Sequence, residues 1–228
     1  MTYTDPELAG SRQHPKLQRP RDAATLILVR RDGPSPRILM GQRHEGHAFM
    51  PNKYVFPGGR LDPGDGRIKP ACDLHAGVLA KLMQRMRSRP STARARGLAV
   101  AALRETFEET GLLLGRKTPD EAPDLSGLIF FARAITPPGR TRRFDSRFFV
   151  ADAAHAGNLD NPHHDGSGEL LTLSWFTLEE TLALELPTIT SDILARLKPF
   201  LDRGRLPGPD CEVSFQHYLG RRWIEDVI

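Results

Sequence analysis

Several features that would fix a class of protein are scarce or missing in this sequence. Only two cysteines occur among its 228 residues, Cys72 and Cys211, and their separation fits no zinc-ligand spacing. We therefore expect reduced thiols rather than a disulfide framework. The longest apolar run, residues 23–29, is far too short to span a bilayer, and no apolar stretch near the N-terminus indicates a secretory signal. These absences lead us to expect a soluble, cytoplasmic protein.

A strong charge of either sign is also missing. Lys and Arg total 32 and Asp and Glu total 28, which leaves a net charge of +4, with a pI near 9.3. This mild positive balance suits a polyanionic small substrate. The basic residues form no dense run with interleaved aromatics, so we do not expect a nucleic-acid partner. RNA end processing is a weaker alternative function, because only the pI supports it.

Three glutamates, by contrast, are crowded at the end of a predicted helix over residues 95–110. Glu105, Glu108 and Glu109 stand at i, i+3 and i+4 and therefore share one helix face. Gly111 is typical of the residue that ends a helix, and the helix dipole disfavours negative charge there. Clustered carboxylates at such a costly position indicate a divalent cation, because hard oxygen ligands suit Mg²⁺ or Mn²⁺. A solvated acidic helix end is the alternative.

A glycine-rich loop precedes that helix. Residues 56–65 read FPGGRLDPGD, a strand end followed by a loop that closes on an acid. The adjacent Gly58 and Gly59 let the backbone approach a ligand closely. Their carbonyl and N–H groups are then available to a metal or a phosphate.

Together the two segments resemble the box of the Nudix hydrolase family, G-x5-E-x7-R-E-U-x-E-E-x-G-U, where U is a large aliphatic residue. The matching residues are Gly59, Arg104, Glu105, Glu108, Glu109, Gly111 and Leu112. Asp65 takes the place of the first glutamate, and Thr106 that of an aliphatic residue. The gap is the largest departure, since 38 residues (66–103) stand where the family pattern has seven.

A long insertion inside the box is itself typical of one Nudix subgroup, the peroxisomal coenzyme A diphosphatase of animals and its bacterial relatives. Further segments are similar to that subgroup: 49–51, 54–59, 135–137, 143–149, 175–176 and 186–190. The resemblance implies an α/β fold, an α/β/α sandwich with a mixed central sheet, and an extra helix in an insertion over residues 66–96.

The resemblance also implies an activity. We expect a metal-dependent diphosphatase that cleaves the diphosphate bond of a nucleoside diphosphate linked to another moiety. Coenzyme A or an acyl-CoA is favoured, giving 3′,5′-ADP and (acyl-)phosphopantetheine. NADH, ADP-ribose or a nucleotide sugar is the alternative, and so is a sensor domain that binds nucleotides without hydrolysis. A homodimer stays open.

Roles for individual residues follow from the resemblance. The expected metal ligands, with Mg²⁺ or Mn²⁺, are the Gly59 carbonyl, Glu105, Glu108 and Glu109. The expected catalytic set is Glu105, Glu108, Glu109 and Arg104, in which Arg104 pairs with Asp65 and holds the loop against the helix. The expected substrate contacts are Gly58, Gly59, Arg43, Arg143 and Arg147. For Arg143 and Arg147, which suit phosphate oxygens, exposed strand charges are the alternative.

The general base is open among a glutamate of the box, Asp152 and Glu169. His44 and His47 precede the glycine loop and are candidates for a substrate contact. The pair at 163–164 lacks a third metal ligand and is interpreted as part of a solvent loop.

Periodicity predicts the remaining elements. Strands are expected at 26–29, 37–42, 53–56, 128–135, 143–151 and 169–176. An amphipathic helix is expected over 73–87. Thr177 and Glu180 form a capping box that opens a helix, and a last helix is expected over 189–201. Residues 1–21 are predicted to be a flexible arm, 22–202 the Nudix domain, and 203–228 a C-terminal extension.

Overall fold

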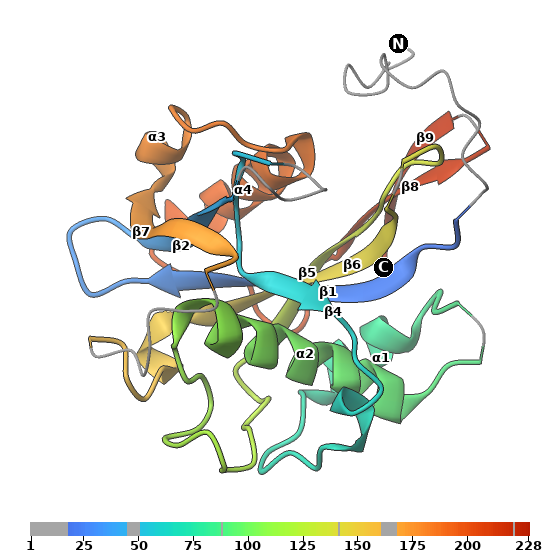
Figure 1. Cartoon of the computed structure of the whole chain (residues 1–228), viewed down its shortest axis with the longest axis horizontal. Coiled ribbons are helices and arrows are strands. Elements are labelled where there is room, and N and C mark those ends of the chain that lie inside the picture. Colours follow the sequence, from blue (N-terminus) through green and yellow to red (C-terminus); the bar gives the residue numbers. More distant parts are fainter. Residues whose placement is uncertain (1–17, 45–50, 88, 141, 161–167, 221) are drawn as a thin grey trace.

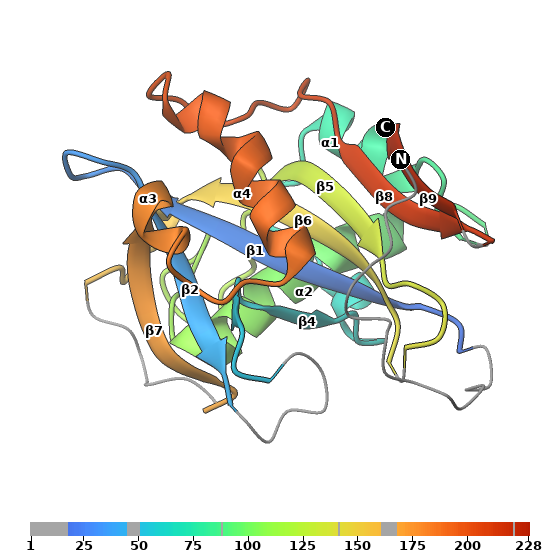
Figure 2. The same cartoon turned by 90° about the horizontal axis from the view of Figure 1, so that it is seen from above.

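The computed structural model describes residues 18–44, 51–87, 89–140, 142–160, 168–220 and 222–228. Nearly all of the predicted N-terminal arm therefore lies outside the described residues. Within them, a sheet of nine strands separates two helical layers (Figures 1 and 2). Helices α1 and α2 cover one face of the sheet, and α3 and α4 cover the other. This arrangement is the α/β/α sandwich that the sequence predicts.

The strands confirm the predicted β segments and add three more, one in the predicted glycine-rich loop at residues 58–60 and two at the C-terminal end. Their bounds are β1 Arg21–Arg30, β2 Arg37–Arg43, β3 Tyr54–Val55, β4 Gly58–Arg60, β5 Ile129–Ile135, β6 Phe144–Asp152, β7 Leu170–Thr177, β8 Ser214–Leu219 and β9 Arg222–Val227. The order is β3-β2-β1-β6-β5-β8-β9, with β4 paired to β1 and β7 paired to β2. Because β1 is parallel to β6 and β5 to β8, while the other pairs are antiparallel, the sheet is mixed.

The central strand β1 explains why the sheet is covered on both faces. Its residues 26–29 are completely buried, as expected for a continuous apolar strand between two layers. Leu26 and Leu28 belong to the core shared with α1 and α2, whereas Ile27 and Val29 belong to the core shared with α4.

Helix α2, Thr92–Thr110, carries the glutamates. It begins three residues before the predicted start, because Ser91 Oγ accepts a hydrogen bond from the Arg94 N–H at 3.3 Å and so caps the first turn. It ends at Gly111, whose left-handed φ of 72° is the predicted termination. Thr106, unusual for the box, is buried and donates its hydroxyl to the Ala102 carbonyl at 2.7 Å, which satisfies the polar group inside the core.

The insertion contains a shorter helix than predicted. Helix α1 spans Ala76–Met83 rather than 73–87, because His75 caps its start and Arg85 adopts a φ of 52° beyond its end. The predicted apolar stripe is nevertheless buried against α2 and comprises Leu74, Val78, Leu82 and Met86. The insertion therefore docks on the α2 side of the sheet.

The C-terminal extension predicted over residues 203–228 contributes two strands to the sheet, because β8 pairs with β5 in parallel and β9 pairs with β8. The 3₁₀ turns Asp65–Arg67 and Ala153–His155, the capped helix α3 at Leu178–Thr181, and α4 at Thr188–Leu201 complete the fold. No helix among the described residues combines the length and apolar character needed to cross a membrane.

Candidate active site

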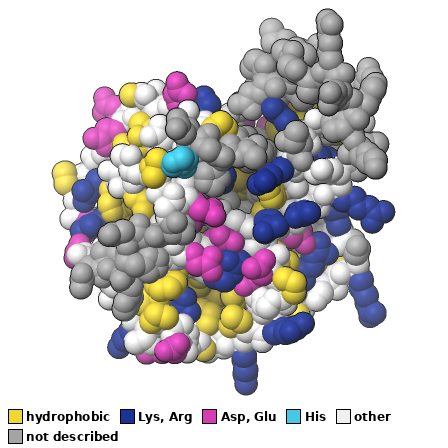
Figure 3. Space-filling model, viewed as in Figure 1, with side chains coloured by type: hydrophobic (Ala, Val, Ile, Leu, Met, Phe, Trp, Pro, Cys, Tyr) yellow, Lys and Arg dark blue, Asp and Glu magenta, His cyan; other side chains and the backbone are white. Residues whose placement is uncertain are grey.

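A cavity of about 950 Å³ opens at one face of the sheet, beside β4 and the C-terminal half of α2. Five of the residues predicted to contact metal or substrate line it: Arg43, Gly58, Gly59, Glu105 and Arg143. On the face drawn in Figure 3, carboxylates gather near the centre and basic side chains gather to one side of them.

Glu109 is the most deeply buried of the three glutamates, with 4% of its surface exposed. Its Oε2 accepts a hydrogen bond from the Gly58 N–H at 2.9 Å. Burial raises the pKa of Glu109 from 4.5 to about 8, and the charge of Glu105 adds to the rise, while the Gly58 hydrogen bond and Arg43 oppose it. This carboxyl group therefore lacks enough positive charge around it to ionise readily.

Gly59 provides the space for Glu105. A Cβ atom at Gly59 would overlap the Glu105 carboxylate, so a larger residue there would force the Glu105 side chain out of this position. Pairing with β1 fixes β4 in this place, with Gly59 opposite Ala24. The pKa of Glu105 is also raised, and burial is the main cause. The two halves of the predicted motif are thus in direct contact.

Arg104 and Asp65 form the predicted brace across the insertion. Arg104 Nε donates to Asp65 Oδ1 at 3.0 Å, and its Nη2 donates to Asp65 Oδ2 at 3.2 Å and to the Arg60 carbonyl at 2.9 Å. Asp65 is 2% exposed, and its Oδ2 also accepts from the Asp62 N–H at 2.8 Å. The shorter side chain of aspartate therefore still reaches the arginine, and the loop is held to α2.

Arg104 also contacts two of the glutamates. Its Nη1 donates to Glu105 Oε1 at 2.9 Å and to Glu108 Oε2 at 3.0 Å. The part of the chain that the structure describes holds no preassembled group of three metal-binding side chains. The donor set nevertheless fits a hard divalent cation, because it consists of oxygen ligands and includes a buried carboxyl group with too little positive charge nearby.

Of the candidates for a general base beyond the box, the structure brings Glu169 to the cavity. Glu169 directly precedes β7 and is close enough to influence the pKa of both Glu105 and Glu109. Asp152 does not line the cavity. It accepts hydrogen bonds from Arg31 Nε and the Ala154 N–H, both at 3.0 Å.

The alternation of β6 separates the two arginines that were expected to clamp phosphates. Phe144, Ser146 and Phe148 line the cavity, so Arg147 lies on the opposite face of the strand. Its side chain is 1% exposed, and its Nη1 donates to Asp22 Oδ1 and to the Asp145 carbonyl, both at 2.6 Å. Arg147 is therefore neither a substrate contact nor an exposed charge on the strand. It belongs to a buried ion-pair network with Asp22 and Asp145.

The remaining predicted contacts divide between the cavity and other places. Arg143 lines the cavity, but its Nε and Nη1 donate to the carbonyls of Thr136 and Gln18 at 3.0 and 2.9 Å, so it also holds the β5–β6 turn. Arg43, on β2, lies near Glu109 and Glu169, and burial lowers its pKa. His44 does not line the cavity, and the predictions for 47 and 163–164 fall outside the described residues.

Sequence reasoning missed a group of cavity residues that come from β1, the β5–β6 turn, β8 and β9. They are Arg21, Arg140, Arg142, Gln216, Tyr218 and Trp223. The signal that was present is the density of arginine in the turn after Pro137-Pro138-Gly139. The last three come from β8 and β9, which the sequence had placed outside the domain.

Comparisons with known proteins give partial matches. No family model matches the chain. Nudix hydrolase 7 of Caenorhabditis elegans is 34% identical over 156 residues, which are 57% of this chain and 43% of that protein. Acyl-coenzyme A diphosphatase NUDT19 of Gallus gallus is 34% identical over 128 residues, 44% of this chain and 34% of that protein. The match thus spans less than half the length of either curated relative.

A solved structure supports the same assignment over a larger share of the chain. The NUDIX hydrolase of Alicyclobacillus acidocaldarius is 26% identical and superposes with a TM-score of 0.60, covering 79% of this chain and 91% of that one. Box residues that meet in space, the sandwich fold and these likenesses agree: the chain is a member of the Nudix superfamily that resembles the coenzyme A diphosphatases.

Proposed function

We propose that this chain is a metal-dependent hydrolase that cleaves the diphosphate bond of a nucleoside diphosphate linked to another moiety. The observation that carries the proposal is the packing of Glu105 against Gly59, with Glu109 bonded to Gly58, at the edge of a cavity that also presents arginines. Carboxylates and arginines in one cavity suit a polyphosphate substrate, because the carboxylates can hold a metal ion and the arginines can contact phosphate oxygens.

The metal ligands in this proposal are Glu105, Glu108, Glu109 and the Gly59 carbonyl. A bound Mg²⁺ or Mn²⁺ would offset the charge that develops on the phosphate oxygens and acidify the attacking water. Arg104 has a positioning role in this proposal. It anchors the loop through Asp65, and it stabilises Glu105 and Glu108 in the absence of metal.

Glu169 is the general base in this proposal, because it lines the cavity with Glu105 and lies on a separate element from the ligand set. It accepts the proton of a water molecule that attacks one phosphorus. The bond from that phosphorus to the bridging oxygen breaks, and the products are two phosphomonoesters. Arg43 is positioned to contact the non-bridging oxygens, since it lines the same cavity as Gly58 and Gly59 and lies near Glu109.

Coenzyme A or an acyl-CoA is the favoured substrate, giving 3′,5′-ADP and (acyl-)phosphopantetheine. Two observations support this choice: the partial match to an acyl-coenzyme A diphosphatase, and a cavity of about 950 Å³ whose walls include apolar groups for a non-nucleotide moiety. Those apolar residues are Val55, Phe56, Ile135, Phe148 and Ile189. NADH, ADP-ribose and nucleotide sugars are the alternatives.

The test is a panel of CoA, acetyl-CoA, NADH, ADP-ribose and UDP-glucose, each with Mg²⁺ or Mn²⁺, followed by product identification in ¹⁸O-labelled water. The label reports the attacked phosphorus together with the products. Turnover of CoA in preference to the others is expected. Clear turnover of another member without turnover of CoA would overturn the CoA assignment, and nucleotide binding without any turnover would favour a sensor domain.

A further inference from the structure

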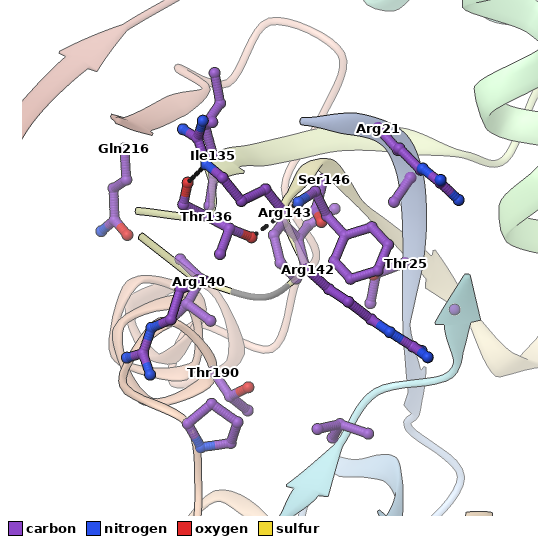
Figure 4. Close-up of a pocket in the computed structure, with 18 of the residues that line it drawn as sticks. Arg21, Thr25, Ile135, Thr136, Arg140, Arg142, Arg143, Ser146, Thr190 and Gln216 are labelled. Atoms are coloured by element: carbon purple, nitrogen blue, oxygen red, sulfur yellow. Dashed lines mark hydrogen bonds between the residues drawn. The ribbon is translucent and has the colours of Figure 1, made fainter. Parts of the chain in front are cut away.

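One wall of the cavity presents hydrogen-bond acceptors and aromatic rings. We call it the far wall and define it by four residues of the lining: Asp192 from α4, Gln216 and Tyr218 from β8, and Trp223 from β9. The function proposed above gives none of them a role. Figure 4 shows the Gln216 side chain at the edge of the cavity, with its amide oxygen on the side of Thr136.

Strand register places the far wall across the sheet from the glycine loop. Gln216 is opposite Ala134 on β5, which is opposite Ser146 on β6. Ser146 in turn is opposite Ala23 on β1, and all four residues line the cavity. Neighbouring strands lie about 4.8 Å apart, so β8 is about 14 Å from β1, while β4 with Gly59 pairs along the other edge of β1. A row of small side chains therefore leads from the glycine loop to Gln216.

The amide of Gln216 is held in one orientation by Asp192. Its Nε2 donates to Asp192 Oδ2 at 3.3 Å. Because an ionised carboxylate can only accept hydrogen bonds, Oε1 is the amide atom that turns away from it. Gln216 is 3% exposed, and none of the residues that the structure describes donates a hydrogen bond to its Oε1. Since buried acceptors are normally satisfied, this open acceptor indicates a ligand that brings a hydrogen-bond donor to the wall.

The two rings of the far wall suit a planar ligand group. Tyr218 and Trp223 are opposite each other in the β8–β9 hairpin, with ring centroids 5.2 Å apart and ring planes inclined by 66°. Both residues are half-buried and line the cavity. Aromatic rings stack on nucleobases whatever the base, whereas the amide edge of a glutamine distinguishes one base from another.

We propose that the far wall is a nucleobase subsite that selects a base with an exocyclic amino group, such as adenine. The base packs against the rings of Tyr218 and Trp223, and its amino group donates to Gln216 Oε1. A base with a carbonyl oxygen in the same place, such as hypoxanthine, sets one acceptor against another and is disfavoured. This inference deepens the proposed function and rests on it for the placement of the diphosphate at Gly58 and Gly59.

Binding of two nucleotides tests the subsite without turnover. Adenosine 5′-monophosphate and inosine 5′-monophosphate share the ribose and the phosphate, but an oxygen replaces the amino group of the base in the second. Isothermal titration calorimetry on the full chain gives both affinities. The adenine nucleotide is expected to bind tenfold or more tightly, which is about 1.4 kcal/mol, because the inosine nucleotide leaves the Gln216 acceptor unpaired. Equal affinities would overturn the proposal.

A substitution of Gln216 locates the discrimination. Gln216→Leu keeps nearly the same volume but removes the acceptor, so this variant should bind the two nucleotides within about threefold of each other. Gln84→Leu is the matched control, since it makes the same change at an exposed position outside the cavity, and it should keep the full preference. A preference retained in Gln216→Leu, or lost equally in Gln84→Leu, would overturn the assignment.

Asp192→Asn gives a second, independent readout. An asparagine can donate as well as accept, so the Gln216 amide can then turn and present Nε2 to the base. The inosine nucleotide should therefore bind about threefold or more tightly to this variant than to the unsubstituted chain, a gain that damage to the wall cannot produce. Weaker binding of both nucleotides by the same factor would assign Asp192 and Gln216 a purely structural role and overturn the proposal.

Hydrolysis separates this inference from the proposed function. The adenine substrates of the panel and their hypoxanthine analogues have the same diphosphate. If both are turned over with equal kcat/KM, the subsite is wrong while the diphosphatase activity stands. If no member of the panel is turned over, but the adenine nucleotide binds preferentially and Gln216→Leu loses that preference, the subsite stands and the activity is wrong.

Discussion

The two ends of the cavity are built in different ways. At the carboxylate end, the groups come from the middle and end of a long helix and from a strand wedged against it, and Glu109 and Asp65 are almost completely buried. At the far wall, Gln216 bonds to Asp192, and its Oε1 accepts no hydrogen bond from the described residues. Bonds to Gly58, Arg60 and Asp65 tie the first end together.

This difference matches what each end has to do in the proposed function. Chemistry at phosphorus needs ligands held within a fraction of an ångström, and regular elements with a braced surrounding supply that precision. Recognition of a base needs an acceptor that the protein leaves open, because the ligand then supplies the missing hydrogen bond. Substitutions at the carboxylate end should therefore affect catalysis and stability, and those at the far wall should affect binding alone.

The largest effect is expected from Glu109→Gln. It removes a proposed metal ligand while its amide oxygen can still accept the Gly58 hydrogen bond. Loss of several kcal/mol of transition-state stabilisation corresponds to about 10³-fold in kcat, since each 1.36 kcal/mol is a factor of ten. The measurement is steady-state turnover of the best substrate at saturating Mn²⁺.

Glu212→Gln is the matched control for this substitution. It makes the same chemical change at an exposed position outside the cavity, and its kcat should equal that of the unsubstituted chain. A Glu109→Gln variant that keeps more than about a tenth of the turnover would contradict a direct role for this carboxylate in metal binding.

The next effect tests the brace. Asp65→Asn weakens the ion pair with the half-buried Arg104, which should lower the free energy of unfolding by about 1–3 kcal/mol, because Arg104 loses one carboxylate partner and keeps Glu105 and Glu108. Urea unfolding at pH 7 measures it. Asp62→Asn is the control, since the Asp62 side chain is 60% exposed and its distance to Arg104 is 3.9 Å. Equal stability of the two variants would show that the brace contributes nothing specific.

The sequence predicts the carboxylate end well because its information is local. The spacing of Glu105, Glu108 and Glu109, the ending glycine and the adjacent pair at 58–59 each leave a short pattern. Even the pairing of Arg104 with Asp65 across the long insertion follows from the motif. The orientation of Glu105 and Glu108 towards Arg104 does not follow from the motif, because the motif gives only residue spacing. Which side chains contact one another depends on whether a metal ion is bound.

The far wall was missed for a physical reason. Its residues come from α4 and β8–β9, and only the sheet order brings them to the cavity. Arg147 was assigned to the cavity because its residue type suits phosphate, but the two-residue alternation of β6 turns it to the other face. In β7 the backbone departs from a regular strand at Thr172, whose φ is 50°, and the neighbouring Leu171 is 41% exposed.

A smaller effect is expected from pH in the absence of metal. Burial raises the pKa of Glu109 from 4.5 to about 8, so the unfolded chain ionises this group first as pH rises. Stability from Glu109 is therefore fully present below pH 4.5 and is lost between 4.5 and 8. From pH 5 to 6.5 the loss should be about 2 kcal/mol, at 1.36 kcal/mol per unit of pH.

The comparison that isolates this term is unfolding of the unsubstituted chain and of Glu109→Gln in EDTA at both pH values. The variant should lack the loss, so that it becomes relatively more stable as pH rises. Parallel pH dependence of the two proteins would contradict the raised pKa. Binding of Mn²⁺ to the unsubstituted chain should also release a proton below pH 8, which calorimetry in buffers of different ionisation enthalpy detects.

The smallest effect is expected at Arg142, an arginine of the lining that belongs to neither end. Arg142→Ala should change the free energy of unfolding by less than about 0.5 kcal/mol, because the side chain is exposed and forms no ion pair with another described residue. The kcat for NADH and for CoA should also be unchanged. If Arg142→Ala instead lowers kcat for NADH and CoA equally, the arginine contacts the reacting diphosphate. The cavity would then contain one continuous site rather than two ends with separate roles.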